Sequence, residues 1–424
     1  MGGVATTTWP PEQGHRIIVT ADDPPPGGHA PAGNEGMILF ALAAMQFIGL
    51  VDFMIVMPLG PELIADLSID TQRFSWIVSA YTIVAGLAGF LAAPWLDRVP
   101  RRTAYLVFAV GMLAGTAACG LAGSYPLLLA ARGVTGGFGG LLGGLSLAIV
   151  ADVFPPERRG RATGTLMLAF AAASVAGVPL GIALGTRLGW PWPFFALTAL
   201  GIPLLGLAAW SLPPLPPHPD VAARRPLASL LDTLTVPVHR RAFALIGLLM
   251  VGAFAVIPFI STALMANAGV TAAQLPIVFI AGGLLTMATT PLAGRLVDHR
   301  GPLTVYRCIV PFSALMMLVV THLPAVGIVG AAAAVALLMA SNSARMVTAT
   351  SLITASVDPG RRGGFMSVNS SVQHVACGLG STLGGLMVEG GAGEPLRHFG
   401  TVGILAASVT VASVFLASHI QPRA

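Results

Sequence analysis

Lysine is absent from this chain, and charged residues of every kind make up only 9% of its 424 residues. A soluble domain carries about 25% charged residues, so this chain has too little charge to cover a water-exposed surface. Without lysine there is no Gly-x-x-x-x-Gly-Lys-Ser/Thr loop, which excludes nucleotide-driven pumping. All 22 basic residues are arginines, and most lie in short loops rather than on one basic face. We therefore expect no nucleic-acid partner.

Signatures of catalysis and metal binding are also missing. Cys119, Cys308 and Cys377 lie far apart in apolar segments, which indicates buried thiols rather than a disulfide or metal framework. The sequence has no His-Glu-x-x-His, no Gly-x-Ser-x-Gly and no paired carboxylates within its apolar segments. These absences argue against an intramembrane hydrolase or transferase. We predict that the chain is not an enzyme and uses no metal and no cofactor.

Long apolar runs are abundant instead: 55% of the residues are hydrophobic, and the mean hydropathy is +0.82. About 20 consecutive apolar residues suffice to cross a bilayer as a helix. Runs of this length predict an all-α membrane protein with twelve transmembrane helices. They fall near 37–59, 74–96, 103–123, 126–151, 162–186, 193–213, 242–266, 272–295, 303–323, 325–357, 365–389 and 398–418.

The chain also divides into two halves. Residues 214–241, rich in proline and paired arginines, cannot span a membrane and predict a central cytoplasmic linker between six-helix bundles at 37–213 and 242–419. Asp97-Arg98-Val99-Pro100 recurs as Asp298-His299-Arg300-Gly301, and Arg158-Arg159-Gly160 recurs as Arg361-Arg362-Gly363, at offsets of 201 and 203. These repeats predict a duplicated, pseudo-symmetric unit. Residues 1–36 predict a disordered cytoplasmic tail, and residues 420–424 form a short second tail.

The arginines predict the orientation in the membrane. Seventeen of the 22 fall in loops or tails on the side of the two termini, whereas three, Arg73, Arg187 and Arg397, fall on the other side. Arg132 and Arg345 lie inside predicted spans. Cytoplasmic loops carry the excess of arginine, so we expect a multi-pass protein of the cell membrane with both termini in the cytoplasm.

Four motifs carry a resemblance to a known family. They are the loop Ala93-Pro94-Trp95-Leu96-Asp97-Arg98-Val99-Pro100-Arg101-Arg102, the stretch from Arg132 to Gly139, the stretch from Gly177 to Gly185, and the span that holds Asp52 and Pro58. Together they resemble the major facilitator superfamily, and specifically its bacterial twelve-span drug:proton antiporters. The resemblance implies two bundles that alternate access to a central site. Both glycines of the family's loop signature are replaced here, by Ala93 and Pro100.

The resemblance also implies roles for particular residues. The loop after the second span and its repeat would form a cytoplasmic gate, and the glycine-rich motif in the fifth span would keep an antiporter from leaking. The gate residues are Asp97, Arg98, Arg101, Arg102, Asp298 and Arg300, and the antiporter motif is Gly177, Pro179, Gly181 and Gly185. The glycines of this motif are equally explained by close helix packing.

Asp52 stands out because it lies within an apolar span, where an aspartate costs about 2.5–3.5 kcal/mol to insert. Helical rise places Asp52 and Arg132 at similar depths, both toward the outside of the membrane, so we expect the two side chains to meet. One hypothesis is that this pair binds and releases the transported proton. The alternative is a structural ion pair that only orients two helices.

Further residues are candidates for a substrate cavity. Aromatic and methionine side chains adapt to apolar compounds, and a polar stripe on the eleventh span offers hydrogen bonds or, at His374, a second titrating group. Lipid contact, helix packing and hydrogen bonding to the backbone are the alternatives at these positions. The candidates are Gln46, Phe53, Met57, Tyr81, Arg345, Asn369, Gln373 and His374.

The resulting hypothesis is a monomeric, proton-gradient-driven transporter in the lipid bilayer that exports small amphipathic compounds by alternating access. Two alternatives remain at this point. One is a proton symporter that imports a sugar or organic acid, and the other is a sensor of similar architecture that transports nothing.

Overall fold

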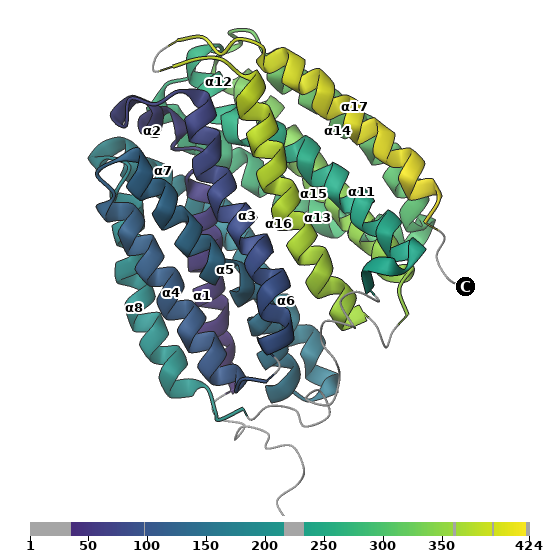
Figure 1. Ribbon diagram of the computed structural model, residues 1–424. Helices are drawn as coiled ribbons and strands as arrows, with labels where there is room; N and C mark the ends of the chain where they lie inside the picture. The colour runs from purple at the N-terminus through teal and green to yellow at the C-terminus, as the bar shows by residue number, and fades with distance from the viewer. Residues whose placement is uncertain (1–34, 97, 216–232, 359–361, 392–393, 421–424) are drawn as a thin grey trace, which may run out of the picture.

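The computed structural model describes residues 35–96, 98–215, 233–358, 362–391 and 394–420, which fold almost entirely into helices (Figure 1). The N-terminal half, residues 35–215, contains α1 (Glu35–Ile55), α2 (Gly60–Asp66), α3 (Thr71–Leu96), α4 (Arg101–Leu121), α5 (Tyr125–Val153), α6 (Pro156–Ala172), the π-helix η1 (Ala173–Gly177), α7 (Val178–Leu188) and α8 (Trp192–Ser211). The C-terminal half, residues 233–420, contains α11 (Pro237–Val256), η2 (Ile257–Phe259), α12 (Ile260–Ala266), η3 (Ala272–Gln274), α13 (Leu275–Arg300), α14 (Pro302–Thr321), α15 (Gly327–Ala355), α16 (Arg362–Met387) and α17 (Phe399–Ser418).

Some of these helices join into single spans. The segments α6, η1 and α7 form one stretch, and α11, η2 and α12 form another, so that eleven stretches of the described chain are long and apolar enough to cross a membrane. The one remaining span among the described residues is α16, which is the eleventh in chain order. Its 26 residues give a length of about 39 Å but include more polar side chains. The prediction of twelve transmembrane helices in two six-helix bundles is confirmed.

Proline sets several helix boundaries. The first span, α1, ends at Ile55, three residues before Pro58, and the seventh begins at Pro237 rather than at residue 242, because proline is tolerated in the first turn of a helix. The π-helix η1 precedes Pro179 and includes a hydrogen bond from the N–H of Val178 to the carbonyl of Ala173. Residues 1–34, 216–232 and 421–424 lie outside the described residues, so the expected tails and linker stay predictions.

The two halves meet along α3 and α16, which lie side by side. Ser79 donates a hydrogen bond to the carbonyl of Gly378 at 2.9 Å, and Thr71 donates to the carbonyl of Val388 at 2.8 Å. These bonds lie at the end of the molecule where α2 packs against α12, which we call the α2–α12 end. Figure 1 shows the two halves approaching each other at this end, at the top, and their ribbons diverging toward the bottom.

A second contact between the halves joins η1 to α13. Gly283 of α13 lies so close to η1 that a Cβ atom at this position would be 2.9 Å from the carbonyl oxygen of Ser174. Glycine is therefore required for this approach. The π-helix thus sits where the fifth span changes its pitch and touches the other half.

Candidate functional site

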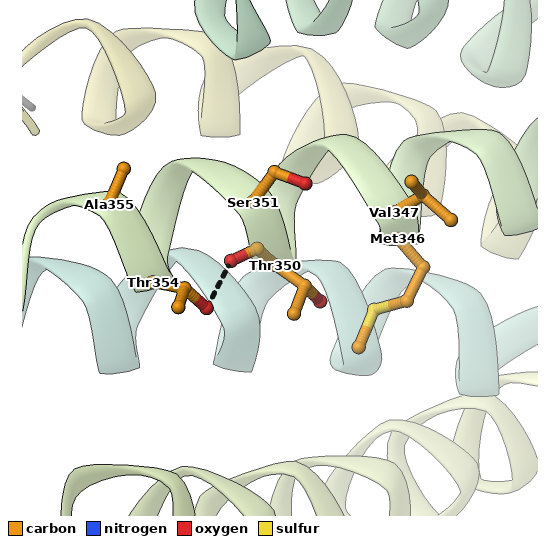
Figure 2. Close-up of a pocket in the computed structure, with 6 residues that line it drawn as sticks. All are labelled: Met346, Val347, Thr350, Ser351, Thr354 and Ala355. Carbon is orange, nitrogen blue, oxygen red and sulfur yellow. Dashed lines mark hydrogen bonds between the residues drawn. The ribbon is translucent and has the colours of Figure 1, made fainter. Parts of the chain in front are cut away.

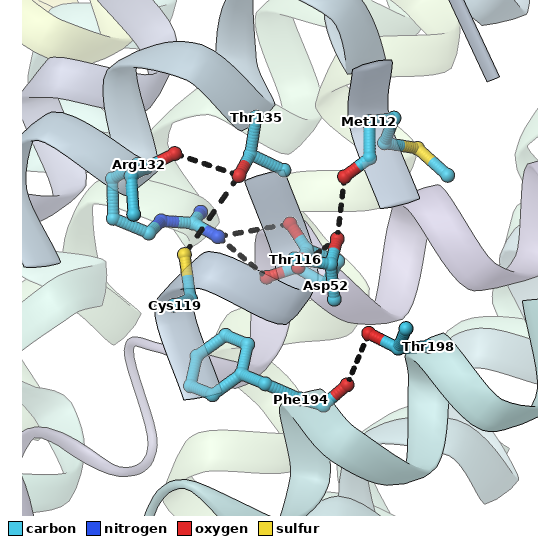
Figure 3. Close-up of polar contacts among 9 residues, drawn as sticks. Asp52, Met112, Thr116, Cys119, Arg132, Thr135, Phe194 and Thr198 are labelled. Carbon is cyan, nitrogen blue, oxygen red and sulfur yellow. Dashed lines mark hydrogen bonds and ion pairs between the residues drawn. The ribbon is translucent and has the colours of Figure 1, made fainter. Parts of the chain in front are cut away.

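An ion pair joins α1 and α5 in the interior of the N-terminal half (Figure 3). The Nη1 atom of Arg132 donates to Oδ2 of Asp52 at 2.8 Å and to the backbone carbonyl of Asp52 at 3.3 Å. The side chain of Asp52 is 0% exposed and that of Arg132 is 1% exposed. The structure therefore confirms the expectation that these two residues meet.

A third helix, α4, completes the coordination of the carboxylate. Thr116 donates to Oδ1 of Asp52 at 3.0 Å, and its hydroxyl also lies 2.9 Å from the carbonyl of Met112, one turn earlier on α4. A hydroxyl has one proton and two acceptor lone pairs, so it can face either group as donor. Thr116 is thus placed to bond an ionised or a protonated Asp52.

The guanidinium of Arg132 is held on its face as well as at its edge. Its Cζ atom lies 4.5 Å from the centre of the Tyr81 ring, a cation–π distance. Within the described part of the chain, the Nε atom of Arg132 is buried and has no hydrogen-bond partner. An incompletely satisfied buried pair is only weakly favoured over its separated form.

Glycines allow the helices that carry this pair to approach closely. A Cβ atom on Gly136 of α5 would collide with the backbone carbonyl of Tyr81 on α3. On α7, a Cβ on Gly181 would lie 2.6 Å from Cδ1 of Ile55, one turn beyond Asp52 on α1. The glycines predicted as an antiporter motif therefore pack against the helix that carries Asp52, and Gly177 and Gly185 make the same kind of contact with Val51 and Leu59.

A row of aromatic rings leads from the ion pair to the C-terminal half. The ring of Phe53 lies 5.1 Å from that of Tyr81 and 6.0 Å from that of Phe254 on α11, measured between ring centres. Because Tyr81 also covers Arg132, three successive rings connect the guanidinium with the other half. Phe53 and Tyr81 were both expected to line a cavity, and the structure places them together at the junction of the halves.

The other cavity candidates in α1 and α16 lie apart from the ion pair. Gln46 is half-buried between α1 and α5, next to Gly143, whereas Met57 lies in the hydrophobic core just beyond α1. On α16, Asn369 is buried with an unpartnered Oδ1 among the described residues, and the Nδ1 atom of His374 lies 2.9 Å from the carbonyl of Ser370. Gln373 is half-buried beside His374. Their role in substrate binding stays a prediction.

Arg345 is 2% exposed and faces the interior of the C-terminal half. It donates to the hydroxyl of Thr410 on α17 at 2.9 Å and to Oδ1 of Asn342 at 3.0 Å. Both partners are neutral, so no ion pair with either of them stabilises this buried cation. The structure does not bring Arg345 to Asp52 or to the rings around it, and its expected contact with substrate stays a prediction.

Two residues of the site were not predicted from the sequence. Thr116 carries no signal that separates it from the other hydroxyl residues of the spans. Phe254 does have one: it follows Phe53 by 201 residues, the same offset that relates Asp97 to Asp298. Applying the repeat to single positions within spans would therefore have identified Phe254 as the C-terminal counterpart of Phe53.

Comparison with known proteins identifies the family. Residues 42–381 match the Major Facilitator Superfamily. The chain belongs to the Major Facilitator Superfamily. It is therefore a multi-pass membrane protein of a transporter family. This membership agrees with the two bundles and with the resemblance seen in the motifs.

The sequence identity to individual superfamily members is low. An uncharacterized MFS-type transporter of Mycobacterium tuberculosis, Rv1250, is 33% identical over 186 residues, which are 44% of this chain and 32% of that protein. The chloramphenicol resistance protein of Streptomyces lividans is 28% identical over 267 residues, 62% of this chain and 67% of that protein. The chain thus spans about a third of the first relative's length and two thirds of the second's. A solved bacterial homologue of the human lysosomal transporter Spinster has a TM-score of 0.73 over 92% of this chain and 98% of that one, at 18% identity, and is similar in fold.

The gate residues expected for this superfamily transporter are only partly described. Asp97 lies outside the described residues. Arg101 forms an ion pair with Asp152 of α5 at 2.7 Å, and Arg102 donates to the carbonyl of Ala209 on α8 at 2.7 Å. Both contacts stay within the N-terminal half. Arg98, Asp298 and Arg300 are exposed at helix ends, and the role of the whole set as a gate stays a prediction.

Glu62 adds a titratable group at the α2–α12 end of this superfamily transporter. It lies on the short helix α2, outside the spans, and its Oε2 atom is buried without a hydrogen-bond partner among the described residues. Burial raises the pKa of Glu62 above its usual range. The other carboxylate on α2, Asp66, is instead held by the indole N–H of Trp190 at 2.6 Å.

We expect Glu62→Gln to remove a pH dependence of closure at the α2–α12 end. When this end opens, water solvates Glu62 and its pKa returns toward the ordinary value, so the closed form binds the proton more tightly. Closure is then favoured as the pH falls and is lost as the pH rises through the raised pKa, by up to about tenfold per pH unit. Distances between spin labels at Ala65 and Ala273, measured from about pH 5 to pH 8, check this. In Glu62→Gln the distance should not change with pH, whereas in Glu157→Gln, at the opposite end, it should change as in wild type. The same pH dependence in Glu62→Gln and wild type would refute the assignment.

Proposed function

We propose that this transporter exports small amphipathic compounds and that proton entry through Asp52 drives the export. The observation that supports this proposal is the buried group formed by Asp52, Arg132 and Thr116, in which a carboxylate inside the membrane has partners suited to both of its protonation states. Intramembrane ionisable residues of transporters mark ion and proton pathways. Thr116 serves the second carboxylate oxygen in the ionised state and can accept a hydrogen bond from Asp52 in the protonated state.

The proton step uses groups already in place. While Asp52 is ionised, it accepts hydrogen bonds from Arg132 at 2.8 Å and from Thr116 at 3.0 Å. When it takes up a proton, its attraction to Arg132 weakens and its new O–H donates to the oxygen of Thr116. The hydroxyl of Thr116 then donates to the carbonyl of Met112. Because neither state leaves the carboxyl group without a partner, a bound compound needs to supply only a modest free energy to shift the equilibrium.

The proposed cycle alternates access between the two ends. The excess of arginine in the loops on the same side as the two termini favours a cytoplasmic position for the tails, and the α2–α12 end then faces the outside. On this assignment the structure corresponds to a state closed toward the outside. Release of the guanidinium from Asp52 would shift the rings of Tyr81 and Phe53 against Phe254, and so loosen the contact between the halves.

Export is favoured over import by two observations. Gly177 of η1 and Gly181 of α7 pack against α1 within a turn of Asp52, the close contact that an antiporter needs in order not to leak protons. The relative from Streptomyces lividans is named a chloramphenicol resistance protein, and export is a direct way to confer resistance on a cell. Chloramphenicol is therefore the first compound to test.

The decisive experiment measures proton release from inside-out vesicles with an acidic lumen after addition of chloramphenicol and of a panel of dyes, sugars and organic acids. We expect a compound-dependent release from wild-type vesicles and its loss, by about tenfold or more, in Asp52→Asn, because an amide does not carry the transported proton. Glu157→Gln, an exposed carboxylate away from the site, serves as the control. Proton release by Asp52→Asn at the wild-type rate would contradict the proposed coupling.

A further inference from the structure

A pocket of about 560 Å³ lies on the last third of α15 (Figure 2). Because α13, α14 and α15 follow α12 in alternating directions and pack together, this part of α15 lies at the opposite end from the α2–α12 contact. Its walls are Met346, Val347, Thr350, Ser351, Thr354 and Ala355. Figure 2 shows Met346, Thr350 and Thr354 along one side of the helix and Val347, Ser351 and Ala355 along the other. The volume is within about 300–1,000 Å³, the range of small-molecule sites, but the pocket is largely open, and the six described residues that line it all belong to α15.

The six described residues that line this pocket combine hydroxyl groups with apolar side chains and carry no charge. The hydroxyl of Thr354 is engaged, because it donates to the carbonyl of Thr350 at 2.8 Å. The side-chain hydroxyls of Thr350 and Ser351 form no hydrogen bond with any described residue. Two hydroxyls that can both donate and accept therefore remain for a ligand. Met346 adds a flexible apolar surface that adapts to different shapes.

Arg345 does not contribute its charge to this pocket although it precedes Met346 directly. Its guanidinium points to the interior of the C-terminal half, where it bonds Thr410 and Asn342. Asp52 and Arg132 lie in the other half and are sealed by packing. A charged compound would thus find no counter-charge among the described residues that line this pocket, which is unfavourable, whereas an uncharged compound would lose little hydration and gain hydrogen bonds.

We propose that this pocket is a loading subsite that takes up uncharged amphipathic compounds bearing hydroxyl or carbonyl groups before they reach the junction of the halves. The inference rests on the proposed function and narrows its substrate class. Because the pocket and the proton site lie in different halves, loading and proton coupling are separable. Changes in the pocket should raise the concentration needed for half-maximal transport and leave the maximal proton release unchanged.

The test uses a cysteine at position 350, which reports on the pocket without any transport. Cys119 and Cys377 are buried and Cys308 is exposed, so Thr350→Cys is made in a Cys308→Ser background. In purified protein we expect chloramphenicol, an uncharged compound with hydroxyl and amide groups, to slow labelling of this cysteine by an uncharged maleimide. Tetraphenylphosphonium, a permanent cation, should not protect it. Equal protection by both compounds, or by neither, would overturn the assignment of an uncharged site.

A second pair of variants measures loading during transport. Ser351→Trp fills the pocket and should raise the half-maximal chloramphenicol concentration for proton release about tenfold, which is a common effect of losing one good contact. Thr354→Val, whose hydroxyl is already engaged, should raise it far less. An unchanged half-maximal concentration in Ser351→Trp would overturn the subsite while leaving export intact. Protection of the cysteine at position 350 without any proton release would instead contradict the proposed function and support the pocket.

Discussion

Arg132→Ala is expected to destabilise the folded protein by about 3–5 kcal/mol, because it leaves the carboxylate of Asp52 buried without its counter-charge and with only the hydrogen bond from Thr116 among the described residues. Both side chains are buried, with Asp52 0% and Arg132 1% exposed, so the carboxylate loses its counter-charge away from bulk water. The substitution also removes the cation from the face of Tyr81. The measurement is the temperature at which half of the detergent-solubilised protein remains monodisperse, compared with wild type.

The double variant Asp52→Leu/Arg132→Met separates stability from coupling. Replacing both members of a buried ion pair with apolar side chains is often neutral or stabilising, so most of the lost thermal stability should return. Proton release should not return, because no group is left to carry the proton. If the double variant recovered both stability and compound-dependent proton release, the ion pair would be structural only. If Arg132→Ala were as stable as wild type, the charge of Arg132 would not be needed to hold Asp52 in place.

The twelve-helix fold could be predicted from the sequence because membrane insertion depends on local composition. Runs of about 20 apolar residues must become helices in lipid, since no other segment satisfies its own backbone hydrogen bonds there. The span least marked by hydropathy is α16, which is polar because it packs between α3 and α11 rather than facing lipid on all sides. Its existence follows from the repeat, which requires a counterpart to the fifth span.

Only part of the candidate site could be predicted from the sequence, and the reason is physical. Asp52 and Arg132 are charged residues inside apolar spans. Because burying a charge there costs free energy, such residues are rare and could be identified from the sequence as functional candidates. The partner Thr116 and the orientation of Arg345 depend on how helices rotate about their axes, which the apolar pattern determines poorly when every face is hydrophobic. The pocket on α15 belongs to the same class of feature, because its lining residues are ordinary for a membrane helix.

Gly385→Leu is expected to abolish transport while the protein still folds. Gly385 lies on the face of α16 that meets α3, where an added side chain would collide with the side chain of Ser75 and approach the carbonyl of Thr71 at 3.4 Å. Hydrogen bonds such as that from Ser381 to the carbonyl of Ser75, at 3.2 Å, hold this contact together. Overpacking costs about 1–3 kcal/mol, which changes the ratio of closed to open forms at the α2–α12 end by about 5–150-fold.

Two other glycines of α16 provide matched controls for this effect. Gly364 has open space at its Cβ position, so Gly364→Leu should leave transport and stability unchanged. Gly384 faces the backbone of Ala255 in its own half, so Gly384→Leu should lower thermal stability instead of opening the contact between halves. Spin-label distances between Ala65 and Ala273 check the assignment, since only Gly385→Leu should lengthen them while thermal stability stays near wild type. Wild-type distances together with wild-type transport in Gly385→Leu would show that closure at the α2–α12 end does not pass through the contact of α3 with α16.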